Sequence, residues 1–466
     1  MARGPWHEEV DLIVVGASTA GLAAAVTAAD RGCRTIVLER TKELGGDAAT
    51  DADVVAAAGS RFQQSAGIDD TAAALAQDIL TATRHHLEPE LATALAAQSA
   101  ALVAWMADRC GVGVELLATC APGHSVARLH LPGERGGATL AADLSRAASR
   151  HSHVSVRSGT TAERLVKDDA GAVRGIAVRG ERRGAPQMLG GRVLVACGGF
   201  AADDALVAEH CPELAALPWC GRTRVAGDAL RFATEVGAQL RRLGSGAVTP
   251  FLAMPGQLDV TAPLVDLGAI LVNQAGRRFA DETSARLPLA KVVRAQPGRL
   301  AYLLFDDRIA AAARAIDPYF ARVVLPRTGR RGATVEDLSK QLELDAEGLR
   351  LTLETFNGNL ELGGDPFGRQ QFDGPLEPPF HAIRVTGARS RTHGGLAIDA
   401  AGRVLDANAA PIAGLYAAGG AAAGLAGEGT DARLTGTDAL AALGIARLAA
   451  LDVIASVHAR RASDDG

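Results

Sequence analysis

Two glycines, a serine and a glutamate stand at fixed spacings within residues 11–40, DLIVVGASTAGLAAAVTAADRGCRTIVLER. Gly16 permits a tight turn after an apolar run, and Gly21 permits a helix to approach the preceding strand closely. The free amides at the start of such a helix, together with its dipole, attract a pyrophosphate. Glu39, about 20 residues further on, can accept hydrogen bonds from a ribose and disfavours a 2′-phosphate. The pattern predicts a dinucleotide site and argues against NADP there.

Ser18 departs from the G-x-G-x-x-G pattern, because it replaces the middle glycine. Serine is small, so we expect the backbone still to approach the phosphate, and the hydroxyl could add a donor. The flanking residues read as strand (VDLIVVG), helix (LAAAVTAADRG, closed by Gly32) and strand (TIVLER). A purely structural βαβ unit is the alternative. The candidate cofactor contacts in this unit are Gly16, Ser18, Ala20, Gly21, Glu39 and Arg40.

Glycine-rich turns recur further along the chain. ELGGDAAT follows the first unit directly, RVLVACGGFAADD (192–204) reads as a third strand, and residues 414–450 read as strand, glycine-rich turn and helix. A chain that begins and ends with such segments brings its two ends to one ligand. An ordinary glycine turn is the alternative for ELGGDAAT. The candidate cofactor contacts in these segments are Gly45, Gly46, Asp47, Gly198 and Gly419.

The composition limits the classes of function. The chain has 466 residues, of which 48% are apolar and 22% charged, and its formal net charge is −5. It is long enough for two domains and carries no basic footprint for nucleic acid. We read no apolar run as long enough to cross a bilayer and no signal core in MARGPWHEEV, and therefore expect a cytoplasmic protein without a membrane partner. Six cysteines without C-x-x-C spacing argue against zinc, iron–sulfur and attached haem, so no metal site is expected.

Several segments occur in an order that is typical of one family. The first βαβ unit is followed by VLVACGGF, GAILVNQAGRRFADE, PLEPPFHAIRV, THGGLAID and GLYAAGG. In this order they resemble the fumarate reductase/succinate dehydrogenase flavoproteins over nearly the whole chain, with the FAD-dependent reductases and dehydrogenases, including relatives of the 3-ketosteroid dehydrogenases, as the nearest branch. The resemblance implies FAD and an α/β fold: a doubly wound Rossmann-like FAD-binding domain with an inserted α+β capping domain.

The resemblance also implies domain boundaries and the state of the cofactor. The FAD-binding domain would comprise residues 1–240 and 389–466, and the capping domain residues 241–388. Members of the membrane complexes carry a histidine, linked covalently to FAD, just after the Gly-Gly segment. Residues 47–60, DAATDADVVAAAGS, contain no histidine. We therefore expect non-covalent FAD.

The family reaction moves a hydride between flavin N5 and a carbon next to an activating carbonyl or carboxylate, and it needs a proton donor. In fumarate reductases the donor is an arginine in an NE-x-x-x-R segment, which Asp281–Glu282–Thr283–Ser284–Ala285–Arg286 resembles. An arginine has a pKa above roughly 12, so it can donate only when buried against carboxylates. Glu282 or Asp281 could supply that relay to Arg286. A surface arginine on a loop of the capping domain is the alternative.

A second segment, ARLTGTDA, resembles the family's NRLGGNA/S, whose arginine holds a substrate carboxylate or carbonyl. Arg433 would take this role here, because a guanidinium fork matches a carboxylate. Support of a phosphate or of the backbone is the alternative. Thr437 and Asp438 would lie beside the pyrimidine edge of the flavin. His393, in RTHGGL, replaces the methionine of T-M-G-G and could face the flavin or be a packing residue.

One substrate-binding pair of the fumarate reductases is incomplete in this sequence, and this limits the range of expected substrates. Fumarate reductases hold the second carboxylate with a Thr-Glu pair, whereas here Thr261 is followed by Ala262. We expect a less polar or one-carboxylate small molecule with a carbonyl or carboxylate, and a separate electron donor or acceptor. Two alternatives remain: a ketosteroid or cyclic-ketone dehydrogenase that uses one of the tyrosines Tyr302, Tyr319 and Tyr416, and a non-catalytic flavin-binding protein.

Overall fold

A computed structural model describes residues 6–47, 54–180, 185–221, 226–260, 263–362, 364–430 and 432–464. Its internal contacts divide the chain into two compact units. Unit 1 comprises Met1–Pro212, Arg222–Gly246 and Arg391–Gly466, and unit 2 comprises Glu213–Gly221 and Ala247–Ser390. The positions Thr261 and Ala262, on which the missing carboxylate clamp was predicted, lie outside the described residues, as does part of the segment 47–60.

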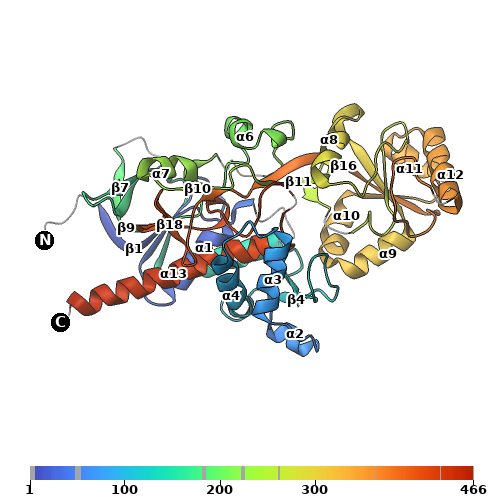
Figure 1. The fold of residues 1–466 in the computed structure, drawn as a ribbon. Coiled ribbons are helices and arrows are strands. Elements are labelled where there is room, and N and C mark those ends of the chain that lie inside the picture. The colour runs from blue at the N-terminus through green and yellow to red at the C-terminus, as the bar shows by residue number, and fades with distance from the viewer. Residues whose placement is uncertain are drawn as a thin grey trace. The chain divides into compact units, whose positions relative to one another are not determined.

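Unit 1 is built on a largely parallel sheet with the strand order β18-β19-β9-β1-β2-β6 (Figure 1). The central strand β1 (Glu8–Val15) pairs in parallel with β2 (Thr35–Leu38) and with β9 (Gln187–Val195). Parallel strands are buried on both faces, which explains why β2 and the second half of β1 are largely apolar. The other strands of this sheet are β6 (Val154–Arg157), β7 (Thr161–Lys167), β8 (Val173–Arg179), β18 (Arg403–Leu405) and β19 (Pro411–Ala417).

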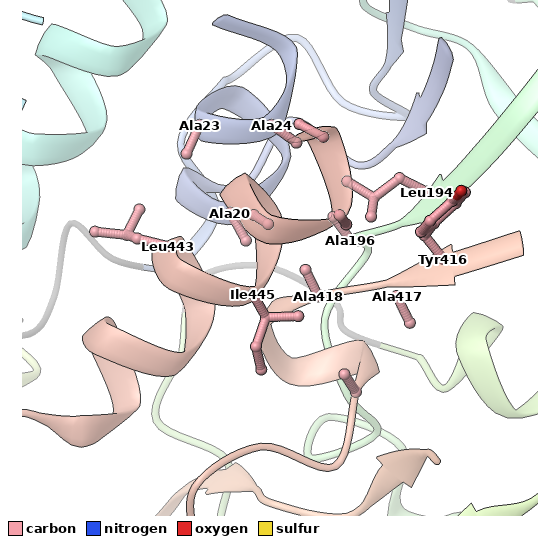
Figure 2. Close-up of a cluster of buried hydrophobic side chains, with 14 of the residues drawn as sticks. Ala20, Ala23, Ala24, Leu194, Ala196, Tyr416, Ala417, Ala418, Leu443 and Ile445 are labelled. Carbon is pink, nitrogen blue, oxygen red and sulfur yellow. The ribbon is translucent and has the colours of Figure 1, made fainter. Parts of the chain in front are cut away.

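Small side chains let the helices of unit 1 lie close to this sheet. Helix α1 (Thr19–Ala29) packs against α13 (Thr437–Asp464) and α5 (Gly137–Ser149). Figure 2 shows Ala20, Ala23 and Ala24 of α1 beside Leu443 and Ile445 of α13 and above the ends of β9 and β19. Because alanine adds one methyl group to the backbone, the two helices and the sheet form one dense core.

The remaining elements of unit 1 surround this core. Strands β3 (Val55–Ala56), β5 (Leu129–Pro132) and β4 (Val114–Leu116) form an antiparallel sheet, and β10 (Leu240–Arg241) pairs with β17 (Gly395–Leu396). The other helices are α2 (Arg61–Ser65), α3 (Ala72–Ala82), α4 (Pro89–Asp108), α6 (Asp204–His210), α7 (Asp228–Val236) and the 3-10 helices η2 (Pro212–Leu214) and η5 (Gly419–Ala421).

Unit 2 has a different architecture, with an antiparallel sheet and its own helices. The strand order is β12-β11-β16-β14-β13, and β15 pairs with β16. The strands are β11 (Gly246–Ala253), β12 (Leu258–Asp259), β13 (Ile270–Val272), β14 (Ala301–Asp306), β15 (Gly329–Gly332) and β16 (Phe380–Thr392). The helices are α8 (Arg286–Arg294), η3 (Pro297–Arg299), α9 (Asp307–Ile316), η4 (Phe320–Val324), α10 (Leu325–Thr328), α11 (Val335–Leu342) and α12 (Ala346–Leu362). The predicted α/β fold with an α+β insertion is confirmed.

Two helices correct the expectation about membrane-spanning length. Helix α4 and residues Thr437–Ser463 of α13 are long and apolar enough to cross a membrane by length and mean hydropathy. Arg447 and Asp452 interrupt the apolar run of α13, which is why its sequence did not predict a membrane-spanning segment. Both helices bury much of their apolar surface inside unit 1, where α13 packs on α1.

Candidate active site

Three loops meet at the carboxyl ends of β1, β9 and β19. Gly16 follows β1 with φ +102°, and a Cβ there would lie 2.6 Å from the carbonyl oxygen of Ala196, which follows β9. Gly419 follows β19, and a Cβ on it would lie 3.1 Å from that of Ala20. A Cβ on Gly21 would lie 2.1 Å from the carbonyl oxygen of Gly16. Ligands bind open α/β sheets at this edge, so glycine is needed where the loops converge.

Ser18 caps helix α1 and joins the first two of these loops. Its Oγ accepts from the amide of Gly21 at 3.3 Å and donates to the carbonyl of Ala196 at 2.8 Å. Its backbone, at φ −68° and ψ 169°, does not require glycine. The hydroxyl proton is therefore directed to Ala196, which corrects the expectation that it could serve as a donor to a phosphate.

The start of α1 presents an unpaired amide close to an acidic residue. The amide of Ala20 makes no hydrogen bond with any described residue, whereas the parallel bridge between Ser18 and Gly45 directs the amide of Thr19 toward the carbonyl of Gly45. Glu39 follows β2, and its Oε2 accepts from the amide of Ala17 at 3.1 Å while Oε1 accepts from Thr41. Oε1 accepts from both the amide and the hydroxyl of Thr41, so Oε2 is the oxygen that keeps capacity for a further donor. This arrangement fits the pyrophosphate and ribose of FAD.

The other predicted cofactor contacts surround the same edge of the sheet. The amide of Gly45 donates to Ala17 at 2.7 Å, and a Cβ on Gly46 would lie 3.4 Å from that of Ser18. Gly198 has φ +82°. Asp47 follows Gly46 in the same turn. Arg40 instead pairs with Asp228 of α7 at 3.3 Å.

A cluster of charged side chains occupies the turn before α13 and the end of β16. Nη1 of Arg433 lies 2.7 Å from Oδ2 of Asp438, and Nη1 of Arg391 lies 3.1 Å from the same oxygen. The two guanidinium groups hold the pKa of Asp438 well below its usual range although burial opposes this. Thr437 is fully buried, and its hydroxyl donates to the carbonyl of Leu434. Arg433, which was expected to bind the substrate, therefore forms an ion pair with Asp438, which was expected to lie beside the flavin.

His393 lies at the same cluster and is buried. Its Nδ1 is 3.8 Å from Oδ1 of Asp438, which is too long for a hydrogen bond. Burial lowers the pKa of His393 to about 4, so the ring is neutral at pH 7. Its Nε2 is buried without a partner among the described residues. Since buried polar atoms are normally paired, the free Nε2 fits a bound group that donates to it or accepts from it.

Arg286 and Glu282 lie in unit 2, and the predicted relay between them is not formed. Arg286 begins α8, is exposed, and makes no hydrogen bond or ion pair with any described residue. The carboxylate of Glu282 is fully buried and accepts from the amide of Leu271, from Arg278 and from Arg369. Glu282 is therefore part of a buried ion-pair network of unit 2 in this structure, and its carboxylate oxygens are already occupied.

Two residues of the site were not predicted as functional. No role was predicted for Arg391 from the sequence, because its ion pair with Asp438 depends on the fold of the chain. Nε2 of His124 donates to the carbonyl of Thr435, 3.0 Å away, and its buried Nδ1 has no partner among the described residues. A lone histidine in a loop carries no sequence signal for such a position.

The three tyrosines lie in the interiors of their units. Tyr302, Tyr319 and Tyr416 are 3%, 2% and 5% exposed. The hydroxyl of Tyr302 lies 3.4 Å from the carbonyl of Leu342, and that of Tyr416 donates to Asp452 at 2.8 Å. These contacts give no support to a tyrosine-dependent mechanism. Within the described ranges there is also no group of three metal-binding side chains.

Comparison with known proteins agrees with this architecture. A family described as "FAD binding domain" matches residues 11–430. The chain is 31% identical over 436 residues to fumarate reductase (cytochrome) of Shewanella frigidimarina, covering 92% of this chain and 74% of that one.

Solved structures show the same likeness. The open conformation of a flavocytochrome c3 fumarate reductase superposes with a TM-score of 0.82 at 26% identity, covering 97% of this chain and 79% of that chain. A 3-ketosteroid-Δ4-(5α)-dehydrogenase from Rhodococcus jostii RHA1, in complex with 4-androstene-3,17-dione, superposes with a TM-score of 0.68 at 25% identity and covers 97% and 98%. The resemblance stated from the sequence is confirmed: the chain belongs to the FAD binding domain family, among the fumarate reductases and related flavoprotein reductases, and is an FAD-dependent oxidoreductase.

Proposed function

We propose that this protein adds or removes hydrogen across a carbon–carbon bond that adjoins a carbonyl or carboxylate of a small molecule. The observation that carries the proposal is the similarity to a fumarate reductase over 92% of the chain. The dehydrogenase crystallised with a dione supports the wider class of carbonyl compounds. Bound FAD would supply or accept the hydride equivalent. The direction of the reaction depends on a separate electron donor or acceptor.

The residues of unit 1 would bind the cofactor and orient the substrate. The free amide of Ala20 at the start of α1 suits the pyrophosphate, and the carboxylate of Glu39 suits a ribose. Arg433 keeps Nε and Nη2 without a partner among the described residues, and these donors would polarise a substrate carbonyl or carboxylate oxygen. The absence of a histidine in residues 47–60 supports FAD that is bound but not covalently linked.

We assign the proton transfer to Arg286 on the resemblance of its segment to NE-x-x-x-R. Its role requires that substrate and protein remove the solvent that now surrounds the guanidinium, because an arginine in water is a very weak acid. Glu282 is paired with two other arginines, so we keep it as a support of the segment that carries Arg286.

One experiment tests the proposed reaction. The FAD-loaded protein is reduced by light under anaerobic conditions and mixed with a panel of α,β-unsaturated acids and ketones. Reoxidation of the flavin by at least one of them, with formation of the saturated product, is expected. If oxygen alone reoxidises it, the non-catalytic alternative holds.

The proton donor is tested with Arg286→Ala and Arg286→Lys. Loss of a general acid typically costs about 10²–10⁴-fold in rate, so both variants should lose turnover with an acceptor found in the panel. Arg294→Ala, at the other end of α8, serves as the control for a lost positive charge. Near-wild-type turnover of either Arg286 variant would mean that another group supplies the proton.

A further inference from the structure

We propose that Asp438 makes the site selective for an uncharged carbonyl compound over a carboxylate. The inference rests on the proposed function, because it takes Arg433 as the substrate anchor. It concerns the substrate class, which the family likeness leaves open. All residues that carry it belong to unit 1.

The carboxylate of Asp438 already occupies the place that a substrate carboxylate would take. Its Oδ2 lies 2.7 Å from Nη1 of Arg433 and 3.1 Å from Nη1 of Arg391. A substrate carboxylate that used both Nη atoms of Arg433 would have to displace Asp438. An uncharged carbonyl oxygen needs a single donor, and Nη2 or Nε of Arg433 can supply it.

The charges of the cluster favour the same conclusion. Asp438 balances one of the two guanidinium charges, and His393 is neutral at pH 7, so the net positive charge that would attract an anion is half that of the two arginines alone. Arg242, which also lies near His393, donates to the carbonyl of Gly424 and pairs with Glu88 at 3.4 Å. A carboxylate on the free donors of Arg433 would lie beside the ionised Asp438, and like charges in a partly buried site repel each other.

The burial of Asp438 makes its charge effective. Its side chain is 18% exposed, so solvent screens it less than a surface carboxylate. The free Nε2 of His393 adds a neutral polar atom next to the cluster, and a substrate with several polar oxygens can contact it without bringing a charge. The site therefore matches a ketone or ester better than an acid.

The test compares two ligands of the same shape and different charge. Cyclohexanecarboxylate and cyclohexyl methyl ketone differ by the replacement of a carboxylate oxygen with a methyl group, and neither contains a reactive double bond. Binding to the oxidised, FAD-loaded protein is measured by calorimetry, which does not depend on turnover. We expect the ketone to bind at least about tenfold more tightly than the acid.

Asp438→Asn should reverse this preference. The substitution removes the charge and keeps the shape, so the affinity for cyclohexanecarboxylate should rise by at least about tenfold while that for the ketone changes much less. Asp108→Asn removes an exposed carboxylate paired with Arg61 and should leave both affinities unchanged.

The outcomes separate this inference from the proposed function. Equal or tighter binding of the acid by the wild-type protein overturns the inference, as does an unchanged preference in Asp438→Asn or the failure of both ligands to bind. The wild-type comparison needs no variant, so a misfolded Asp438→Asn would not rescue the idea. Failure of the proposed function appears elsewhere, as a reduced flavin that no unsaturated acid or ketone reoxidises.

Discussion

Nη1 of Arg433 lies 2.7 Å from Oδ2 of Asp438, within the turn that leads into helix α13. The sequence assigned the first residue to the substrate and the second to the flavin, and the ion pair joins these two roles in one cluster. Because Arg391 contacts the same oxygen, Asp438 is held in its ionised form. A ligand at Arg433 therefore interacts with the combined charge of Arg433, Asp438 and Arg391.

The stability of the protein should fall as the pH is lowered from 6.5 to 4. The pKa of His393 is lowered by burial from 6.5 to about 4, so between these values the unfolded chain binds a proton that the folded chain does not. The stability that depends on a neutral His393 is fully present above pH 6.5. By pH 4 the free energy of unfolding has fallen by roughly 3 kcal/mol. Urea unfolding at several pH values measures it.

His393→Gln isolates this contribution from those of other buried histidines. His124 and His130 also have pKa values lowered by burial, and they act in the same direction. The variant should keep their part of the pH dependence and lose the part of His393. An identical dependence in wild type and His393→Gln would show that the imidazole of His393 is protonated at its ordinary pH in the folded protein.

Ser18→Ala should lower stability without abolishing FAD binding. The hydroxyl caps α1 and donates to Ala196, and loss of a helix cap typically costs about 1 kcal/mol. Because the hydroxyl is already engaged, the Kd for FAD should change less than about threefold. Unfolding curves and an FAD titration measure the two effects. A tenfold weaker affinity at unchanged stability would mean that the hydroxyl contacts the cofactor.

The sequence predicted the first βαβ unit well because its signals are local. An apolar run specifies the strand, Gly16 adopts the positive φ of the turn, and Gly21 allows the helix to approach closely. Each of these features can be recognised from a few neighbouring residues. Residues 332–360 show one continuous helical periodicity in the sequence, yet the structure divides them into α11 and α12 at Glu343, which adopts a left-handed conformation with φ 58°. Periodicity continues across such a break and does not reveal it.

The sequence identified residues of the candidate site but not the contacts between them. Arg433, Asp438 and His393 were named from short motifs, whereas their contacts depend on how β16 and α13 approach each other in the folded chain. The relay from Glu282 to Arg286 was expected from their closeness in sequence. In the structure Glu282 is bound instead by Arg278, four residues before it, and by Arg369 from a distant segment of the chain.

Glu282→Gln should destabilise unit 2. The buried carboxylate pairs with two arginines, and removing one partner of a buried ion pair typically costs about 3–5 kcal/mol, since the remaining charges stay buried. Asp281→Asn is the control, because the carboxylate of Asp281 accepts from Thr283 alone among the described residues and lies nearer the surface. A Glu282→Gln variant that loses turnover and keeps the wild-type urea midpoint would favour the relay over the structural role.

Gly21→Ala should prevent α1 from reaching its place on the sheet. A Cβ at this position would lie 2.1 Å from the carbonyl oxygen of Gly16 and 2.9 Å from Cγ1 of Val14, and backbone atoms there cannot move without breaking the strand. Overpacking in a dense core costs about 1–3 kcal/mol or more, so a large loss of stability and of FAD binding is expected. Gly358→Ala, on the exposed face of α12 with no atom within 4 Å of the new Cβ, should instead gain up to about 1 kcal/mol from helix propensity. Thermal unfolding of both variants gives the comparison, and a Gly21→Ala protein as stable as the wild type would refute the close contact of helix and strand on which the cofactor site depends.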